Sequence, residues 1–238
     1  MTDSRRGFVP SDEKEFSVES VKILRRAQKD ILYLMNQGYP IKNASTFVGN
    51  HYMLSERQRL AIVRASSSGE ELVLRKGKEL TSDTLGTSVV IDGLNTIITL
   101  EVALSQGILI RCMDGCIRDL AGLRGTYRLI HQTDLAIQLL GEKLSQLKVE
   151  EIIFYLDSPV SNTGRLKSRI FELLGAYPFR LQVEVVHDVD VRLQQMEGVI
   201  SSDSIILNKC KSWFNIVNII MEDLSMELIE LALSNSAN

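Results

Sequence analysis

The eight residues Ser88–Asn95, which read SVVIDGLN, decide the fold of this 238-residue chain. Three apolar β-branched residues in a row indicate a buried strand, and the strand stops at Asp92, which a glycine follows. Residues 95–106 then carry a helical pattern. A buried strand that passes directly into a helix begins a βαβ unit, and the same order recurs along the chain.

The recurring order gives the fold class. We predict strands at 89–92, 108–113, 152–157, 181–187, 198–202 and 213–217, and helices near 95–106, 132–148, 162–174, 189–196, 203–210 and 221–234. Near-continuous apolar strands that alternate with helices indicate a mostly parallel sheet with helices on both faces. The prediction is therefore an α/β fold, built by residues 85–238.

Residues 1–80 follow a different pattern and are predicted to form a small all-α domain. Its helices are expected at 17–37, 41–50 and 55–65, and Ser55 with Gln58 makes a capping box for the third. The charged segment 70–86 is predicted as a linker. Residues 1–80 hold 14 Lys and Arg against 10 Asp and Glu, whereas residues 81–238 hold 13 against 20, so we expect the two parts to have different roles.

Composition excludes several classes of protein. With 45% hydrophobic and 24% charged residues the chain is of the globular type, and no apolar run approaches the ~20 residues of a membrane span. The three cysteines have no partners at zinc-ligand spacing, so we expect free thiols and a cytoplasmic protein. The phosphate-binding loop, the dinucleotide fingerprint and the nucleophile elbow are missing from the sequence.

Acidic residues follow four predicted strands: Asp92, Asp157, Asp188 or Asp190, and Asp203. The carboxyl ends of parallel strands share one edge, where open α/β folds bind ligands, so these carboxylates are expected to converge. Crowded carboxylates repel one another unless a cation neutralises them, and Mg²⁺ or Mn²⁺ prefers such oxygens. The alternative is that each acid caps the helix after it. The sequence leaves the choice between Asp188 and Asp190 open.

These motifs resemble the PIN-like ribonucleases, and most closely their NYN branch. The resemblance covers residues 87–220 and is carried by the order of three short motifs: Asp92-Gly93-Leu94-Asn95, Leu156-Asp157 and Ser201-Ser202-Asp203. It implies a PIN-type sheet, a divalent cation held by carboxylates, RNA cleavage, and pairing of two copies. The whole chain also resembles a two-part prokaryotic family to which no activity is assigned.

The resemblance also implies roles for single residues. Asn95 would position a metal-bound water or the first acid. Asp92 and Asp203 would be the core acids, and Asp157 a further ligand or base. The implied metal ligands are Asp92, Asp157, Asp203 and one of Asp188 and Asp190.

The segment 113–128 is longer and more polar than the resemblance accounts for. One interpretation is a lid that brings substrate-binding side chains to the pocket, with an arginine holding phosphate. The residues concerned are Asp114, Arg118, Asp119, Tyr127 and Arg128. The other interpretation is a surface hairpin with an Asp-Gly turn and a local Arg–Asp pair. Glu101, on the helix after Asp92, is expected to face solvent.

Arg57, Arg59 and Arg64 lie on one predicted helix of the front domain. They indicate either a helix-turn-helix-like contact with the phosphates of RNA or DNA, or basic side chains that are solvated or paired with the acidic part of the chain.

The function predicted from the sequence is that of a metal-dependent endoribonuclease acting on RNA, without a membrane partner. The alternative is a non-catalytic nucleic-acid-binding or regulatory protein with the same fold. A phosphatase of the doubly wound type is disfavoured, because the second aspartate of its motif would stand at Leu94.

Overall fold

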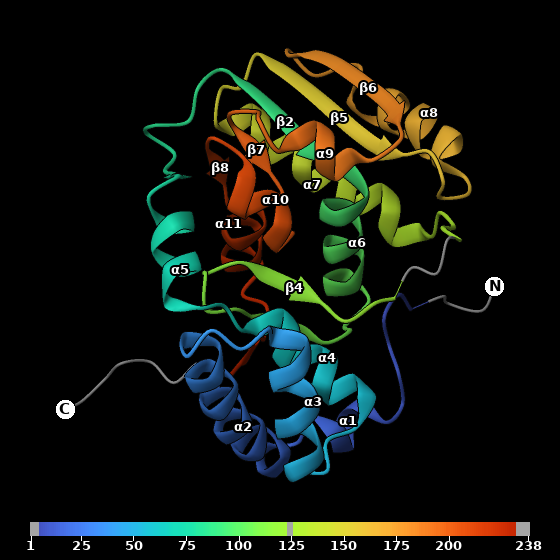
Figure 1. Cartoon of the computed structure of the whole chain (residues 1–238). Coiled ribbons are helices and arrows are strands. Elements are labelled where there is room, and N and C mark those ends of the chain that lie inside the picture. Colours follow the sequence, from blue (N-terminus) through green and yellow to red (C-terminus); the bar gives the residue numbers. More distant parts are fainter. Residues whose placement is uncertain (1–4, 123–125, 232–238) are drawn as a thin grey trace.

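The computed structural model describes residues 5–122 and 126–231 (Figure 1). Six parallel strands form the main sheet in the order β1-β8-β7-β2-β5-β6. Their bounds are β1 (Glu79–Leu80), β2 (Ser88–Asp92), β5 (Glu151–Asp157), β6 (Arg180–Val186), β7 (Val199–Ile200) and β8 (Trp213–Phe214). The predicted α/β class, with a mostly parallel sheet and a helical region before it, is confirmed.

The apolar run of β2 is buried on both faces of this sheet. Val89 and Ile91 pack into a core with four helices, whereas Val90 belongs to a second core on the other face. Successive side chains of a strand point to opposite faces, so both faces need helices. The first face carries α6 (Gly93–Leu104), α7 (His131–Gln146), α8 (Thr163–Leu174) and α11 (Ile216–Asp223), and the second carries α9 (Val189–Leu193) and α10 (Ser204–Lys209).

A second sheet, in the order β4-β3-β9, lies between the main sheet and the N-terminal helices (Figure 1). It consists of β3 (Leu109–Arg111), β4 (Ile117–Asp119) and β9 (Ile229–Glu230). Antiparallel β3 and β4 form the hairpin anticipated from the Asp-Gly pair, and Gly115 takes the left-handed φ of +81° that its turn needs. The strand predicted at 108–113 therefore exists, but it does not belong to the main sheet.

The C-terminal helix predicted at 221–234 is wrong. Helix α11 ends at Asp223, Ser225 has a φ of +50°, and the chain continues into β9, which pairs parallel with β3. The apolar residues that suggested a helix serve other contacts, since Leu231 is buried in the core of the helical part. Residues 232–234 of the prediction lie outside the described residues.

The three helices predicted between residues 17 and 65 are present, and a short helix that was not predicted precedes them. The helical part contains α1 (Asp12–Glu15), α2 (Val18–Asn36), α3 (Ile41–His51) and α4 (Glu56–Ala65). Ser55 and Gln58 form the expected capping box. The core of these helices also takes in Ile110 and Leu120 from the hairpin, so the helices pack directly on the second sheet. The domain boundary between residues 80 and 85 stays a prediction.

The segment 70–86 is more than a linker. Ser68 and Glu71 form a capping box for α5 (Gly69–Lys76), and β1 pairs with β8 at the edge of the main sheet. The sequence signal, a serine three residues before a glutamate, was present and was overlooked. Within the described residues, no helix combines the length and the apolar character needed to cross a membrane.

The strand order creates a switch point beside β2. The chain runs from β2 to β5 and β6 on one side and then returns to β7 and β8 on the other. Helices therefore diverge between the carboxyl ends of β2 and β7, and open α/β sheets bind ligands in the crevice that results. The SVVIDGLN stretch borders this crevice on one side, and Ser201–Asp203 borders it on the other.

Candidate active-site cavity

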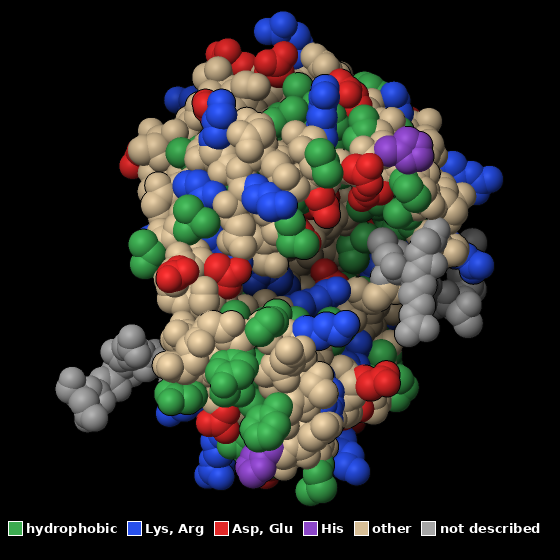
Figure 2. Space-filling model, viewed as in Figure 1, with side chains coloured by type: hydrophobic (Ala, Val, Ile, Leu, Met, Phe, Trp, Pro, Cys, Tyr) green, Lys and Arg blue, Asp and Glu red, His purple; other side chains and the backbone are tan. Residues whose placement is uncertain are grey.

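A cavity of about 500 Å³ opens at the switch point, between the carboxyl edge of the main sheet and the helical part. Figure 2 shows a hollow between the two parts, with basic side chains inside it and acidic ones on its upper side. The sheet edge contributes one wall, which is acidic. Helices α4 and α5 and strand β4 contribute the other, which contains three arginines.

The acidic wall contains one residue from each of the four predicted strand ends. Asp92 ends β2, Asp157 ends β5, Asp190 lies in α9, and Asp203 precedes α10; all four line the cavity. Asp188 does not line the cavity; it is the residue before α9 and has a left-handed φ of +54°. Of these two acids, Asp190 is the one that lines the cavity, and the assignment of a metal ligand between them stays a prediction.

Hydrogen bonds join the two strands that flank the switch point. The hydroxyl of Ser201 donates to Oδ2 of Asp92 at 2.8 Å and accepts from the amide of Asp203 at 3.0 Å. Asp203 caps α10, since its Oδ1 accepts from two backbone amides of that helix. Asp92 makes no such bond to α6. Helix capping therefore accounts in part for the acid at position 203, but not for the acid at position 92.

Gly93 allows helix α6 to start directly after Asp92 and close to β5. A Cβ at this position would lie 2.6 Å from the Cδ2 of Leu156 and 3.1 Å from the carbonyl oxygen of Tyr155. A side chain at this position would require Leu156 or α6 to shift, so the glycine allows α6 to begin this close to β5. The glycine of the opening motif therefore brings the ends of β2 and β5, and with them Asp92 and Asp157, to the same cavity.

The crowding of carboxylates raises the pKa of several of them. Burial, followed by the negative charges of Asp203, Asp157 and Asp190, raises the pKa of Asp92 from 3.8 to about 7. Burial, followed by the negative charges of Asp203, Asp157 and Asp188, raises the pKa of Asp190. Burial also raises the pKa of Asp157, against a hydrogen bond from the amide of Val189. Asp92 therefore binds a proton near neutral pH unless a cation takes its place.

Asn95 presents its amide nitrogen rather than its oxygen. Oδ1 accepts from the backbone amide of Ser202 at 3.0 Å and lies 2.8 Å from the Ser202 hydroxyl. A backbone N–H can only donate, so this contact fixes which way the amide group faces. Because Asn95 lines the cavity, its Nδ2 can serve as a donor there, and its oxygen is not available to a metal.

The donor atoms of the acidic wall suit Mg²⁺ or Mn²⁺ in type. All are carboxylate oxygens, which both ions prefer, and Oδ1 of Asp92 has no hydrogen-bond partner within residues 5–122 and 126–231. Their spacing is wider than a closed site needs, since no group of three or more Asp, Glu, His or Cys in the described chain is arranged to hold a metal ion. The residues fit the ion in chemistry and in position, but not as a preassembled set of ligands.

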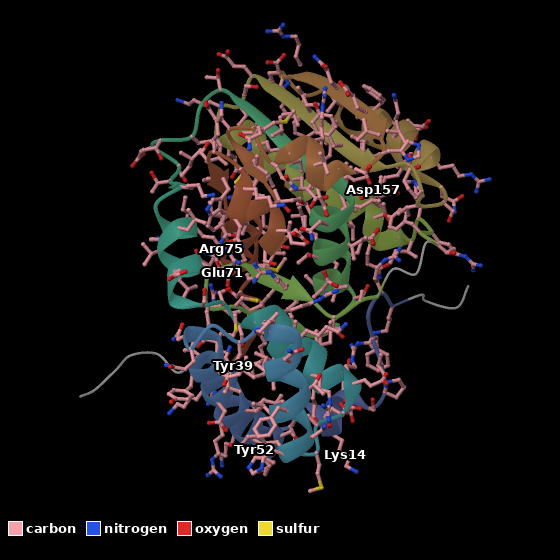
Figure 3. The ribbon with its side chains drawn as sticks, in the orientation of Figure 1. Lys14, Tyr39, Tyr52, Glu71, Arg75 and Asp157 are labelled. Atoms are coloured by element: carbon pink, nitrogen blue, oxygen red, sulfur yellow. The ribbon has the colours of Figure 1, made fainter. Side chains whose placement is uncertain are left out.

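Three arginines occupy the opposite wall, and two of them are held firmly in place. Arg118 donates to the carbonyl oxygen of Ser202 at 2.6 Å and to Asp114 at 2.6 and 3.1 Å. Arg75, on α5, also donates to Asp114 at 2.6 Å, and to Asn208 at 2.7 Å. Figure 3 shows Arg75 beside Glu71 on α5, apart from Asp157 at the sheet. Sequence reasoning missed Arg75 because α5 was not recognised.

Arg64 is the arginine with donors to spare. Its Nη1 donates to the carbonyl oxygen of Asp119, while Nε and Nη2 have no hydrogen-bond partner among the described residues. Its side chain is 31% exposed, against 2% for Arg75 and 8% for Arg118. Arg64 can therefore contact an anion in the cavity.

The hairpin residues divide between the two interpretations. Arg118 and Asp119 line the cavity, as a lid would place them. Asp114 forms the local Arg–Asp pair with Arg118, as a structural hairpin would have it. Tyr127 is 0% exposed and bonds to Glu101 in the core, and Arg128 is exposed and does not line the cavity. The structure thus does not support substrate contacts by Tyr127 or Arg128.

Of the three predicted nucleic-acid contacts, two are occupied elsewhere. Arg57 pairs with Asp12 and donates to the carbonyl oxygens of Leu120 and Gly7. Arg59 donates to the carbonyl oxygen of Leu54 and to Oδ1 of Asn50, and so ties α4 to the preceding loop and α3. Only Arg64 reaches the cavity. Arg57 and Arg59 thus have donors engaged within the protein, and contact with nucleic acid stays a prediction for both.

Glu101 does not face solvent as expected. It is 0% exposed and pairs with Arg6 at 2.5 Å, and Tyr127 donates a hydrogen bond to it at 2.6 Å. The expectation failed because the partner comes from the N-terminal segment, which precedes the first predicted helix. Burial raises the pKa of Glu101, while the charge of Arg6 opposes this rise.

Comparisons with known proteins place the chain in a family. The family model described as "Domain of unknown function (DUF5616)" matches residues 81–219, and "Protein of unknown function (DUF434)" matches residues 23–78. The uncharacterized protein MJ0935 of Methanocaldococcus jannaschii is 36% identical over 200 residues, which cover 84% of this chain and 95% of that protein. No solved structure matches the chain. The chain belongs to the family described as DUF5616, with a segment of the DUF434 type before it.

Proposed function

We propose that the protein is a metal-dependent endoribonuclease that cleaves RNA in the switch-point cavity. The observation that carries this proposal is the convergence of Asp92, Asp157, Asp190 and Asp203 on one cavity wall, opposite an arginine with free donors. Four crowded carboxylates are costly without a cation, and phosphodiester hydrolysis uses one. RNA as the substrate rests on the sequence resemblance, and the cytoplasm as the location rests on the three unpaired cysteines.

Each residue has a role that follows from its surroundings. Mg²⁺ or Mn²⁺, when bound by Asp92, Asp157, Asp190 and Asp203, would supply an activated water and neutralise charge on the phosphate. The pKa of Asp92 in the metal-free protein, about 7, means that this carboxyl would exchange its proton for the cation near neutral pH. Nδ2 of Asn95 and the spare nitrogens of Arg64 would donate to phosphate oxygens from opposite walls.

Cleavage of a labelled single-stranded RNA in Mn²⁺ tests the proposal. We expect cleavage by the wild type and its loss in the Asp92→Asn, Asp203→Asn double variant. Asp188→Asn is the matched control, because it removes a neighbouring acid that does not line the cavity. Equal cleavage by the wild type and the double variant would point to a contaminating nuclease and would refute the proposal.

One observation favours a second candidate function, a nucleic-acid-binding or regulatory protein without catalysis. Within residues 5–122 and 126–231, no three side chains of Asp, Glu, His or Cys are grouped closely enough to hold a metal ion. A protein of this second kind would retain RNA bound in Mn²⁺ without cutting it. DNA contact by the N-terminal helices would rest on Arg64, the one predicted contact that reaches the cavity.

A further inference from the structure

We infer that two copies of this chain join through their β6 strands, which pair antiparallel about Gln182 and make one continuous sheet. Strand β6 is at the end of the main sheet and pairs with β5 alone. The hydrogen-bonding groups on its other side have no strand beside them in the described chain, as the position of β6 in Figure 1 shows. This inference does not depend on the proposed function.

The length of β6 distinguishes it from the other edges. It has 7 residues, whereas β1, β4 and β9, which form the remaining sheet edges in the described chain, have 2, 3 and 2. Proteins usually protect a long edge with proline, lysine or a bulge. The sequence RLQVEVV contains neither residue and is rich in valine, which suits a strand that is covered by another strand.

The backbone of β6 limits the registers that a partner can use. The amide of Arg180 donates inward to the carbonyl oxygen of Glu150, and the carbonyl of Val186 accepts inward from Ser158. Because this direction alternates along a strand, Leu181, Val183 and Val185 direct their backbone groups outward. Pairing about Gln182 places Leu181 opposite the partner's Val183, so two outward-facing residues meet as a hydrogen-bonded pair.

The same register matches opposite charges. It places Arg180 opposite Glu184 of the second copy, at a non-hydrogen-bonded position where side chains are closest. The two-fold symmetry forms this contact twice. Within the described residues neither Arg180 nor Glu184 has an ion-pair partner, and Arg180 is exposed. Phe171 on α8 and Val185 on β6 are 40% and 38% exposed and would add apolar contact beside the joined strands.

Sedimentation velocity of the full chain and its charge variants tests this pairing. We expect a dimer for the wild type, and a Kd roughly tenfold weaker for Arg180→Glu and for Glu184→Arg, because each change sets like charges opposite one another twice. The double swap, Arg180→Glu with Glu184→Arg, restores opposite charges and is expected to restore the dimer. Lys22→Glu, an exposed residue on α2, is the control for net charge.

Three results would overturn the inference. They are a monomeric wild type, a dimer that both single swaps leave unchanged, and a double swap that fails to recover the affinity. Circular dichroism on each variant separates loss of pairing from loss of fold. RNA cleavage is measured in parallel, so the outcome for pairing is independent of the outcome for the proposed function.

Discussion

The hydroxyl of Ser201 donates a 2.8 Å hydrogen bond to Oδ2 of Asp92 and thereby links the ends of β7 and β2 across the switch point. These two residues are 109 positions apart in the sequence. The bond stabilises the ionised form of Asp92, yet burial and three neighbouring aspartates outweigh it and raise the pKa to about 7. The consequences of this balance can be measured.

We predict that Asp92→Asn removes a pH dependence of stability in metal-free buffer. Below pH 4 the carboxyl is protonated in both the folded and the unfolded chain. Between its unfolded pKa of 3.8 and its folded pKa of about 7, the folded state alone retains the proton, so wild-type stability falls as pH rises. At about 1.4 kcal/mol for each pH unit, the loss has an upper limit of a few kcal/mol. Urea unfolding from acid to weakly alkaline pH measures it.

Across that pH range, the unfolding free energy of Asp92→Asn is expected to rise relative to that of the wild type. Above about pH 8 the difference between the two unfolding free energies should be constant. Asp188→Asn, which changes an exposed acid outside the cavity, should follow the wild type. If the Asp92→Asn and wild-type curves run parallel from acid to alkaline pH, the pKa of Asp92 is ordinary.

We predict that Mn²⁺ binds the wild type in competition with protons. A proton on Asp92 must leave before a cation binds there, so the apparent affinity should fall roughly tenfold between about pH 8 and pH 6. Calorimetry in buffers of different ionisation enthalpy counts the protons released. The Asp92→Asn, Asp203→Asn double variant should not bind. Equal affinity in that variant would place the metal elsewhere.

We predict that Arg118→Met costs about 3–5 kcal/mol of unfolding free energy, because it breaks a buried ion pair and leaves Asp114 with Arg75 alone. It also frees the Ser202 carbonyl from its 2.6 Å contact. Lys76→Met is the control, since Lys76 is 82% exposed in its pair with Glu79, and we expect at most ~1 kcal/mol there. Urea unfolding compares the two. Similar losses in both variants would contradict this account.

We predict that Gly93→Ala destabilises the fold by about 1–3 kcal/mol, because the new Cβ would displace α6 from Leu156 and the Tyr155 carbonyl. Gly86→Ala is the matched control. No atom lies within 4 Å of a Cβ at that position, so we expect a change of at most ~1 kcal/mol in either direction. Urea unfolding again gives both values, and an unchanged Gly93→Ala would show that α6 can move without cost.

The sequence predicted the main fold because its signals are local. Apolar β-branched runs such as Val89–Ile91, helical periodicity, and the Ser55 capping box each act over a few residues. Four acids at strand ends also predicted the acidic wall, since parallel strands bring their carboxyl ends to one edge.

Contacts between distant segments were not predictable from such signals. Arg6 meets Glu101 in the core although the two residues are 95 positions apart in the sequence. For this reason Glu101, which the sequence pattern predicted to be exposed, is buried. Arg57 and Arg59 have the sequence pattern of a basic face, yet Asp12 and backbone carbonyls take up their donors. The arginine wall forms only when α5 and the hairpin meet at Asp114, which no sequence spacing reveals.

The last prediction concerns the side-chain amide of Asn95, whose oxygen has a structural contact and whose nitrogen is proposed to bind substrate. In Asn95→Asp one carboxylate oxygen can still accept from Ser202, so we expect the fold to persist. The other oxygen replaces the donor Nδ2 and adds a fourth negative charge near Asp92, so the pKa of Asp92 should rise above 7. RNA binding should weaken for the same reason, and more than in Asn95→Ala, which removes the donor without adding charge. An Asn95→Asp variant that binds RNA as tightly as the wild type would show that Nδ2 makes no contact with phosphate.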